Sequence, residues 1–533
     1  MTLPGLEAAR SYQRAWLPRD LVAGLVLASL LVPQGMAYAE LAGLPAITGL
    51  YTSILCLLAY AAFGPSRVLV LGPDSALGPM IAATVLPLVT AGGDPGRAVA
   101  YASILALLVG VFMLVGARVG LGFIADLLSK PTQIGYMNGL ALTILVGQLP
   151  KLFGFKVNAD GLAGEVVGFA DGLRAGDTVP AALAVGLVAV AIMVVLGRIL
   201  PRVPAVLVAV VVAMGIAYGL DLGTHGVKLV GVLPQGLPPF AIPVPDLRDL
   251  PLLVGGAVGI AVVSLADTIS TSSAFAARTG QEVSANQEMV GIGAANVAAG
   301  LFGGFPVSTS GSRTAVAERA GAKSQVTGLV GASVIAVMLV LVPGLMASLP
   351  QPALAAVVIV ASLSLADLAG TRRLWRQRRV EFALSIAAFL GVAFLGVLPG
   401  IGVAVILSIL EVFLQVWNPY STTLGDVPDL PGFHDTRTYP EAEQLPGLLI
   451  YRFDGALIFA NASTFRREVR ALAGTTPDLR WIVVAAEPIT AVDTTAADML
   501  EELDAGLEAA GISLVFAEMK DAVRTEIRTY GLD

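Results

Sequence analysis

The sequence has few charged residues, one cysteine and two histidines. Of its 533 residues, 13% are charged and 56% are hydrophobic, and the mean hydropathy is +0.81, far from the balance of a soluble domain. The single cysteine, Cys56, excludes a disulfide framework and a thiolate metal site. His225 and His434 lack the spacings of hydrolases and metalloenzymes. We therefore expect no catalytic residues, metal or cofactor, and the formal net charge of -7 argues against a nucleic-acid partner.

Long hydrophobic runs, in contrast, follow one another from Leu21 to Val416. A helix that crosses a bilayer needs about 20 mostly apolar residues, and this region offers about fourteen such stretches. The first run is followed at once by another, without a cleavage site of small residues, so it predicts a membrane anchor and not a removed signal peptide. The sequence therefore predicts an α-helical polytopic protein embedded in the lipid bilayer.

The composition changes sharply after Trp417. Residues 418–446 are rich in Pro, Asp and Glu, and the rest of the chain alternates strand-like and helix-like patterns. Strands are expected at 448–453, 456–459, 481–485 and 512–517, and helices at 464–472, 495–509 and 521–530. We predict a transmembrane domain over residues 1–436 and a small α/β domain over residues 437–533.

The positions of lysine and arginine predict the orientation of the spans. With a cytoplasmic N-terminus, most of these residues in the membrane region fall on the cytoplasmic side. The external loops receive only Arg97, Lys151, Lys156, Arg174, Lys228 and Arg248. By the positive-inside rule, the N-terminus and the α/β domain are cytoplasmic, and the spans lie in the inner (plasma) membrane of the cell.

Two apolar stretches are short and are interrupted where they begin. One follows residues 72–75 (GPDS) and the other follows residues 303–310 (GGFPVSTS). They are the third and the tenth predicted spans, hence the third span of each half. Paired broken spans at matching positions indicate an inverted-repeat transporter whose site lies near the membrane midplane.

A helix that begins inside the membrane is suited to bind an anion. Its first N–H groups lack intrahelical partners, and its dipole places roughly half a positive charge there. Two such ends would offer N–H groups and the hydroxyls of Ser75, Ser310 and Ser312 to a small inorganic or carboxylate anion. Arg313 adds a full charge after the second break; the alternatives are an ion pair that stabilises the fold and a side chain that extends toward the cytoplasm.

Three acidic residues in the spans have candidate roles. Asp267 lies within the apolar run 252–277, where a carboxylate must be protonated, paired or used for a cation. We hypothesise that it carries the coupling proton, with sodium as the alternative ion, because protonation removes a charge that repels the anion. Structural pairing is the other interpretation. Glu40, at the outer end of the first span, is a second candidate for the proton or is only interfacial, and Asp74 is expected to cap its half-helix.

Gln34 and Tyr38 accompany an interruption of the first span at residues 33–35 (PQG). They are four residues apart, so both can face one cavity. Ligand contact and polar packing at a kink remain equally open for this pair.

Several segments resemble the SulP family of sulfate-permease-type transporters, whose animal members include prestin and pendrin. They cover nearly the whole membrane region: 33–45 (PQGMAYAELAGLP), 49–51 (GLY), 72–76 (GPDSA), 135–139 (GYMNG), 148–151 (QLPK), 286–288 (NQE), 303–306 (GGFP) and 312–314 (SRT).

This resemblance implies a seven-plus-seven inverted repeat with core and gate domains, an elevator-like movement, a homodimer and a C-terminal STAS domain. It places an acidic ion-coupling position on Asp267, where many bacterial relatives have Glu. In the STAS region, Thr494 stands where related antagonists carry a phosphorylatable serine, and a helix N-cap is its favoured role here. Carried over residue by residue, the anion site falls on Gln34, Tyr38, Asp74, Ser75, Ala76, Ser310, Gly311, Ser312 and Arg313.

The expected function is secondary active transport of a small anion, such as sulfate, a dicarboxylate such as fumarate, or bicarbonate, by proton symport or by exchange. The alternatives are an uncoupled anion (chloride) channel, a nucleobase symporter and a membrane sensor in which the STAS domain signals. Asp267 favours coupled transport over a channel, and Arg313 favours an anion over a nucleobase. Deletion of residues 446–533 would separate a transporter from a sensor.

Overall fold

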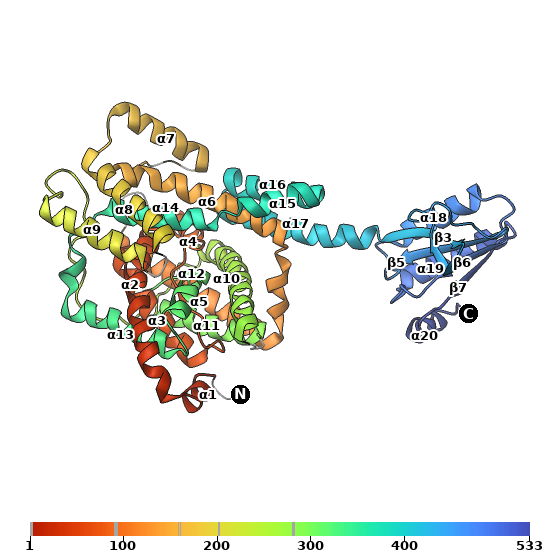
Figure 1. Cartoon of the computed structure of the whole chain (residues 1–533), viewed down its shortest axis with the longest axis horizontal. Helices are drawn as coiled ribbons and strands as arrows, with labels where there is room; N and C mark the ends of the chain where they lie inside the picture. The colour runs from red at the N-terminus through yellow and green to blue at the C-terminus, as the bar shows by residue number, and fades with distance from the viewer. Residues whose placement is uncertain are drawn as a thin grey trace. The chain divides into compact units, whose positions relative to one another are not determined.

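The computed structural model describes residues 4–89, 94–157, 159, 161–200, 203–279 and 283–532. The chain forms two compact units, Met1–Ser408 and Ile409–Asp533. The first unit is almost entirely helical (Figure 1). Its main elements are α1 (Pro4–Arg10), α2 (Leu17–Leu41), α3 (Ala46–Phe63), β1 (Leu71–Gly72), α4 (Gly78–Val85), α5 (Pro95–Val119), α6 (Lys130–Phe153), α7 (Gly161–Ala175), α8 (Pro180–Ile199), α9 (Ala205–Gly219), α10 (Leu250–Thr279), α11 (Ala285–Leu301), β2 (Ser308–Thr309), α12 (Gly311–Arg319), α13 (Val326–Leu341), α14 (Gln351–Leu365), α15 (Leu368–Gln377), α16 (Arg379–Leu390) and α17 (Val397–Trp417), the last of which ends in the second unit.

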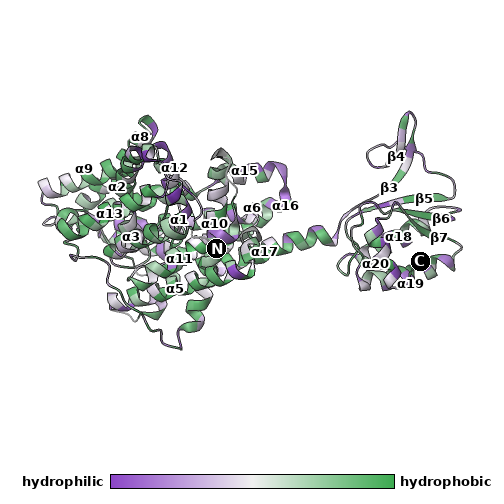
Figure 2. Ribbon diagram, turned by 90° about the horizontal axis from the view of Figure 1, so that it is seen from below, coloured by the Kyte–Doolittle hydropathy of each residue, from purple (hydrophilic) through white to green (hydrophobic). Residues whose placement is uncertain are grey.

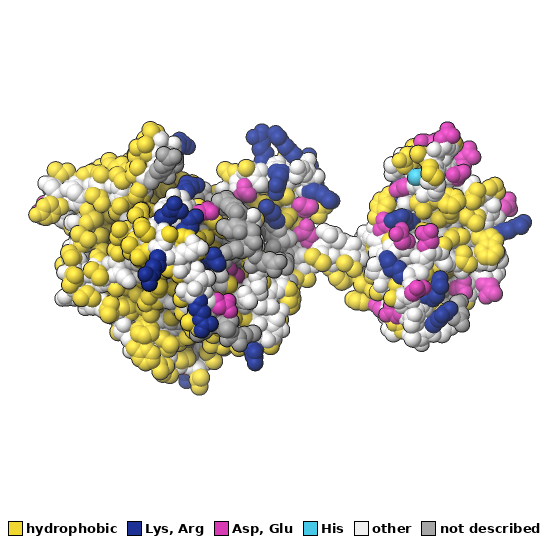
Figure 3. Space-filling model, turned by 60° about the horizontal axis from the view of Figure 1, so that its bottom comes forward, with side chains coloured by type: hydrophobic (Ala, Val, Ile, Leu, Met, Phe, Trp, Pro, Cys, Tyr) yellow, Lys and Arg dark blue, Asp and Glu magenta, His cyan; other side chains and the backbone are white. Residues whose placement is uncertain are grey.

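The helices of the first unit are apolar along most of their length (Figure 2). In the described part of the chain, seven helices are long and apolar enough to cross a membrane, and three apolar helices are shorter. Hydrophobic side chains also cover much of the outer surface of this unit in the space-filling view (Figure 3). Such a surface suits lipid, because a soluble protein rarely exposes so large an apolar area. The total of about fourteen spans stays a prediction.

The two interrupted spans of the sequence are short helices in the structure. Helix α4 has 8 residues and α12 has 9 residues. Each follows a two-residue strand, and β1 pairs with β2 in antiparallel register, with Leu71 opposite Thr309 and Gly72 opposite Ser308. The Ser310 N–H donates to the Val70 carbonyl at 3.1 Å and extends this pairing. The strand pair therefore brings the starts of α4 and α12 together, a contact that the hydropathy pattern does not predict.

Helix α2 is packed closely against α3, α13 and α14. The closest approach to α3 is at a pair of glycines, where a Cβ added to Gly49 would lie 1.9 Å from the Gly35 carbonyl oxygen. Only glycine fits at such a crossing. Since Gly35 directly follows Gln34, this contact fixes the part of α2 that carries the predicted site residues.

The second unit is an α/β domain built on a five-stranded sheet with the order β4-β3-β5-β6-β7. Strand β3 runs antiparallel to β4 and β5, whereas β5, β6 and β7 are parallel. A buried apolar cluster joins the sheet to its helices. The elements are β3 (Tyr420–Val427), β4 (Leu430–Asp435), β5 (Leu448–Asp454), α18 (Ala462–Thr475), β6 (Trp481–Ala485), α19 (Thr494–Glu508), β7 (Ser513–Ala517) and α20 (Asp521–Thr529).

Two expectations for this unit are wrong, and two of its strands were not predicted. Residues 456–459 form no strand, since only Leu457 makes an isolated bridge, to Val492. The polar stretch after Trp417 contains strands β3 and β4, because pairing with β5 stabilises strands that the composition does not favour. The N-cap of α19 is Asp493 and not Thr494, since its carboxylate accepts the Ala496 N–H at 2.8 Å.

Candidate functional site

A cavity of about 450 Å³ lies where α4 and α12 begin. It is enclosed by residues of both half-helix starts, of α2 and α10, and of one face of α14. Most of the predicted site residues therefore meet in one place. The lining residues are Gln34, Tyr38, Asp74, Ser75, Met137, Val206, Asp267, Ser270, Thr271, Thr309, Ser310, Gly311, Ser312, Val357, Val360, Ala361, Ser364 and Leu365.

Helix α2 contributes Gln34 and Tyr38 to this cavity. They are one helical turn apart, so both point in the same direction, as their spacing predicts. Tyr38 is only 5% exposed. An amide and a phenol side by side supply hydrogen-bond donors without a net charge.

Asp74 and Ser75 form the cavity wall at the start of α4. The Asp74 carboxylate accepts the Ala76 N–H at 2.9 Å in the turn before α4, but the N-cap of α4 is Leu77, without a side-chain bond, so the expected capping by Asp74 is wrong. Ala76 itself is buried and does not line the cavity. The backbone of this turn is therefore fixed by Asp74, and the Ser75 side chain faces the cavity.

Ser310 and Ser312 supply hydroxyl groups at the start of α12. The Ser310 side chain is the N-cap of this helix and accepts the Arg313 N–H at 3.5 Å. Its Oγ lies 3.1 Å from the Ser312 Oγ. Two serine hydroxyls and the positive end of a helix dipole thus face the same space as Ser75.

Arg313 is buried behind the half-helix starts and is not among the residues that line the cavity. It is 1% exposed, and its Nη2 lies 3.7 Å from the Asp74 Oδ2. Its three guanidinium nitrogens make no hydrogen bond within the described residues. A Cβ on Gly72 would lie 2.7 Å from Nη1, so the guanidinium sits against β1. Arg313 thus forms the ion pair with an acid that the sequence left as one alternative. The positive charge of Arg313 acts on the cavity only at a distance, because its side chain does not line the cavity.

Asp267 lies in the middle of α10 and faces the cavity. Among the described residues, no Lys, Arg or His nitrogen lies within 4.0 Å of its carboxylate. Thr271, one turn further along, lines the same wall. The cavity therefore combines many neutral donors with a carboxylate that has no cationic partner.

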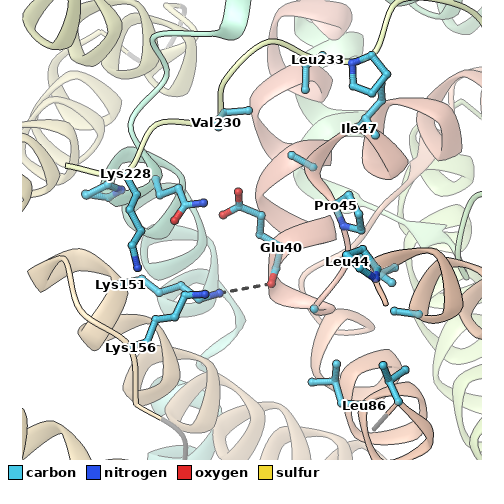
Figure 4. Close-up of a pocket in the computed structure, with 18 of the residues that line it drawn as sticks. Glu40, Leu44, Pro45, Ile47, Leu86, Lys151, Lys156, Lys228, Val230 and Leu233 are labelled. Atoms are coloured by element: carbon cyan, nitrogen blue, oxygen red, sulfur yellow. Dashed lines mark hydrogen bonds between the residues drawn. The ribbon is translucent and has the colours of Figure 1, made fainter. Parts of the chain in front are cut away.

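The structure separates Glu40 from the other predicted site residues. It is six positions beyond Gln34 on α2, about 9 Å along the helix axis. It lines a different cavity, of about 780 Å³, together with Lys151, Lys156 and Lys228 (Figure 4).

Sequence reasoning missed the wall that α14 contributes. Val357, Val360, Ala361 and Ser364 follow the spacing i, i+3, i+4 and i+7, which places them on one helix face. Thr271 lies four residues after Asp267, so helical spacing could have predicted that both residues line the same cavity. These residues were missed because small and apolar side chains in a membrane helix carry no chemical signal of a site.

The fold and this cavity define a multi-pass membrane transporter that carries a second, α/β unit. Residues 17–388 match the sulfate permease family, and residues 439–533 match the STAS domain. The chain therefore belongs to the sulfate permease family.

Similar proteins cover nearly the whole chain. A probable sulfate transporter of Mycobacterium tuberculosis is 42% identical over 530 residues, which are 99% of this chain and 94% of the relative. Human solute carrier family 26 member 6 is 34% identical over 489 residues, 87% of this chain and 64% of the relative. The structure of the murine solute carrier 26 family member A9 anion transporter, in the inward-facing state, matches with a TM-score of 0.91 and 26% identity, over 99% of this chain and 90% of that one. The family consists of transporters, so this chain is a transporter and not an enzyme.

Proposed function

We propose that this protein is a secondary active transporter that moves a small oxyanion together with a proton. One observation carries the proposal: Asp267 shares a cavity with the starts of α4 and α12, and no cation lies within 4.0 Å of it in the described part of the chain. The helix starts and the serine hydroxyls attract an anion, whereas an ionised Asp267 repels it.

This repulsion supplies the coupling. Two unit charges roughly 5 Å apart repel by about 3 kcal/mol at an effective dielectric constant of about 20. An anion in the cavity therefore favours the protonated form of Asp267, and by linkage a bound proton favours the anion. Arg313 offsets little of this repulsion, because Asp74 lies 3.7 Å from its guanidinium.

Sulfate is the substrate to test first. The relative from Mycobacterium tuberculosis is named a probable sulfate transporter, and neutral hydroxyl and N–H donors suit an oxyanion. Fumarate and bicarbonate fit the same donors and are the next candidates.

For movement, we infer that the paired half-helices shift as one body in an elevator-like manner, since β1 and β2 tie them together. A homodimer in the plasma membrane, with the N-terminus and the STAS domain in the cytoplasm, completes the proposal.

The proposal is tested by uptake into liposomes that contain the purified protein. Labelled sulfate, fumarate and bicarbonate are offered in parallel, with and without an inward proton gradient. We expect the gradient to drive accumulation of one of them above its external concentration. A fast chloride leak without accumulation would instead show a channel, and accumulation driven only by a sodium gradient would replace the proton.

A further inference from the structure

The cavity around Glu40 holds an unusual concentration of positive charge. Lys151 comes from the end of α6, Lys156 from the segment after it, and Lys228 from the segment between α9 and α10, where its carbonyl accepts the Gln351 N–H at the start of α14. Figure 4 shows the three side chains reaching toward one cavity, with Glu40 on its other side. The cavity measures about 780 Å³, which exceeds the volume of a small anion with its first water shell.

Among the described residues, these lysines have no carboxylate partner. In the described part of the chain, none of the three has an Asp or Glu oxygen within 4.0 Å. The Lys151 Nζ instead donates to the backbone carbonyl of Glu40 at 3.4 Å. Lys156 and Lys228 are exposed side chains, so three like charges share a cavity with the carboxylate of Glu40.

The nearby acids are either engaged elsewhere or placed next to the site. The Asp94 carboxylate, at the rim, accepts the Gly96 N–H at 2.9 Å and caps α5. Glu165 lines an adjoining cavity together with Glu40 and Lys151. A bound anion would therefore lower the repulsion among the three lysines.

The two cavities are arranged along the same two helices. On α2, Gln34 faces the first cavity and Glu40 the second. On α14, Gln351 lines the lysine cavity, whereas Val357 and later residues line the first. Between these positions the two helices carry a buried apolar layer that includes Ala39, Leu354 and Ala355, each at most 2% exposed.

We propose that the lysine cavity is a second anion site, which captures a small divalent oxyanion or a dicarboxylate at the C-terminal end of α2. The proposal rests on the proposed function and deepens it. The substrate would bind at the lysine cavity first and would reach the first cavity only after the apolar layer opens. Glu40 acts as an internal competitor for Lys151, which keeps binding weak and release fast. Clustered cations of this kind raise the local anion concentration and the association rate.

The first experiment removes the two exposed charges with Lys156→Gln and Lys228→Gln together. We expect the KM for sulfate uptake to rise about tenfold, with most of the effect in KM and a weaker dependence on ionic strength. Lys323→Gln is the matched control: this exposed lysine lies beside Asp20 at the other end of α2, with its N–H 2.7 Å from the Asp20 carboxylate. Equal KM values for the double variant and the control would overturn the proposal.

The second experiment measures occupancy without transport, so it stays informative if the proposed function fails. Lys228→Cys introduces a thiol, while the native Cys56 is 0% exposed and stays protected. We expect an anionic methanethiosulfonate to react faster than a cationic one, and sulfate to slow the reaction in a saturable way. Lys323→Cys should show no protection by sulfate. Equal reaction rates for the two reagents, or no protection at Lys228→Cys, would rule out the site even in a protein that accumulates sulfate.

Discussion

At the scale of single residues, charge inside the membrane unit is arranged in two unlike ways. Asp267 faces the cavity without a cation within 4.0 Å among the described residues, whereas Arg313 is buried and has Asp74 beside it. Burial of an ion is costly, so each arrangement must be balanced by protonation, by a partner or by function. These two sites give the sharpest residue-level tests.

Asp267→Asn should abolish the proton-driven accumulation of the anion. The amide keeps the shape of the side chain but cannot take up a proton, so uptake becomes downhill only and loses its dependence on external pH. Accumulation ratios at external pH values of about 6 and 8 measure this effect. Asp267→Glu should retain the coupling, and Asp171→Asn, a 63% exposed acid on α7, should behave like the parent protein. Full accumulation by Asp267→Asn would refute the assigned role.

Arg313→Gln should destabilise the protein, because it leaves the mostly buried Asp74 carboxylate, whose side chain is 14% exposed, without its cation. Removing one partner of a buried pair costs about 3–5 kcal/mol, which thermal unfolding in detergent would show as a clear fall in Tm. Adding Asp74→Asn should recover part of the loss. Arg97→Gln removes a more exposed pair, with Asp249 at 3.9 Å, and should cost less than about 1 kcal/mol. A double variant no more stable than Arg313→Gln would argue against the pair.

Asp435 predicts a pH dependence of the STAS unit. Hydrogen bonds from the Tyr420 hydroxyl and then from Thr422 lower the pKa of this carboxyl from 3.8 to about 2. A lowered pKa contributes stability that is present above about pH 4 and is lost as the pH falls toward about 2. Asp435→Asn should therefore weaken the fall of Tm over this range. Asp498→Asn, an exposed acid of α19, should keep the slope of the parent, and identical slopes for all three proteins would contradict the assignment.

At the scale of secondary structure elements, glycine contacts hold the site-bearing helices at short distances. The α2–α3 crossing depends on Gly35 and Gly49, and the β1–β2 pair holds α4 next to α12. The site is thus assembled by contacts between elements, each of which is only a few residues long.

Gly49→Ala should disturb both stability and anion binding. Its Cβ would lie 1.9 Å from the Gly35 carbonyl oxygen, so α2 must move away and carry Gln34 and Tyr38 with it. Overpacking of this kind costs about 1–3 kcal/mol. Gly197→Ala on α8, where a Cβ meets nothing within 4 Å, should be neutral or stabilising by up to about 1 kcal/mol. Equal Tm and KM values for the two variants would show that the crossing tolerates a side chain.

At the scale of the whole molecule, the structure indicates a different truncation site between the membrane unit and the STAS unit from the one that the sequence suggested. The sheet of the second unit includes β3 and β4, which precede residue 437. A cut after Pro446 would leave β3 without its partner β5 and expose an unpaired strand edge.

Truncation after Trp417 should therefore leave a monodisperse protein that keeps its anion selectivity, whereas truncation after Pro446 should aggregate. Size-exclusion chromatography followed by liposome uptake compares the two. Loss of selectivity after the Trp417 truncation would favour the sensor interpretation, because a transporter holds its selectivity in the membrane unit.

The sequence by itself determined the membrane character, the two interrupted spans and the polar groups that accompany them. These are local signals: hydrophobic length, a break in a helix, and serines or an acid beside it. Gln34, Tyr38, Ser75 and Ser310 were predicted together on this basis and on the family resemblance, and they do line one cavity.

Only the tertiary structure decided which of these groups face the cavity and which support it. The pairing of β1 with β2 turned Arg313 toward Asp74 and away from the cavity, and the length of α2 placed Glu40 among three lysines from other segments. Strands β3 and β4 likewise could not be predicted from composition, because their place in the sheet depends on the pairing of β3 with β5. In each case the deciding contact joins segments that are separated in the sequence or that have no clear local preference. Such contacts produce no hydrophobic period or motif from which they could be predicted.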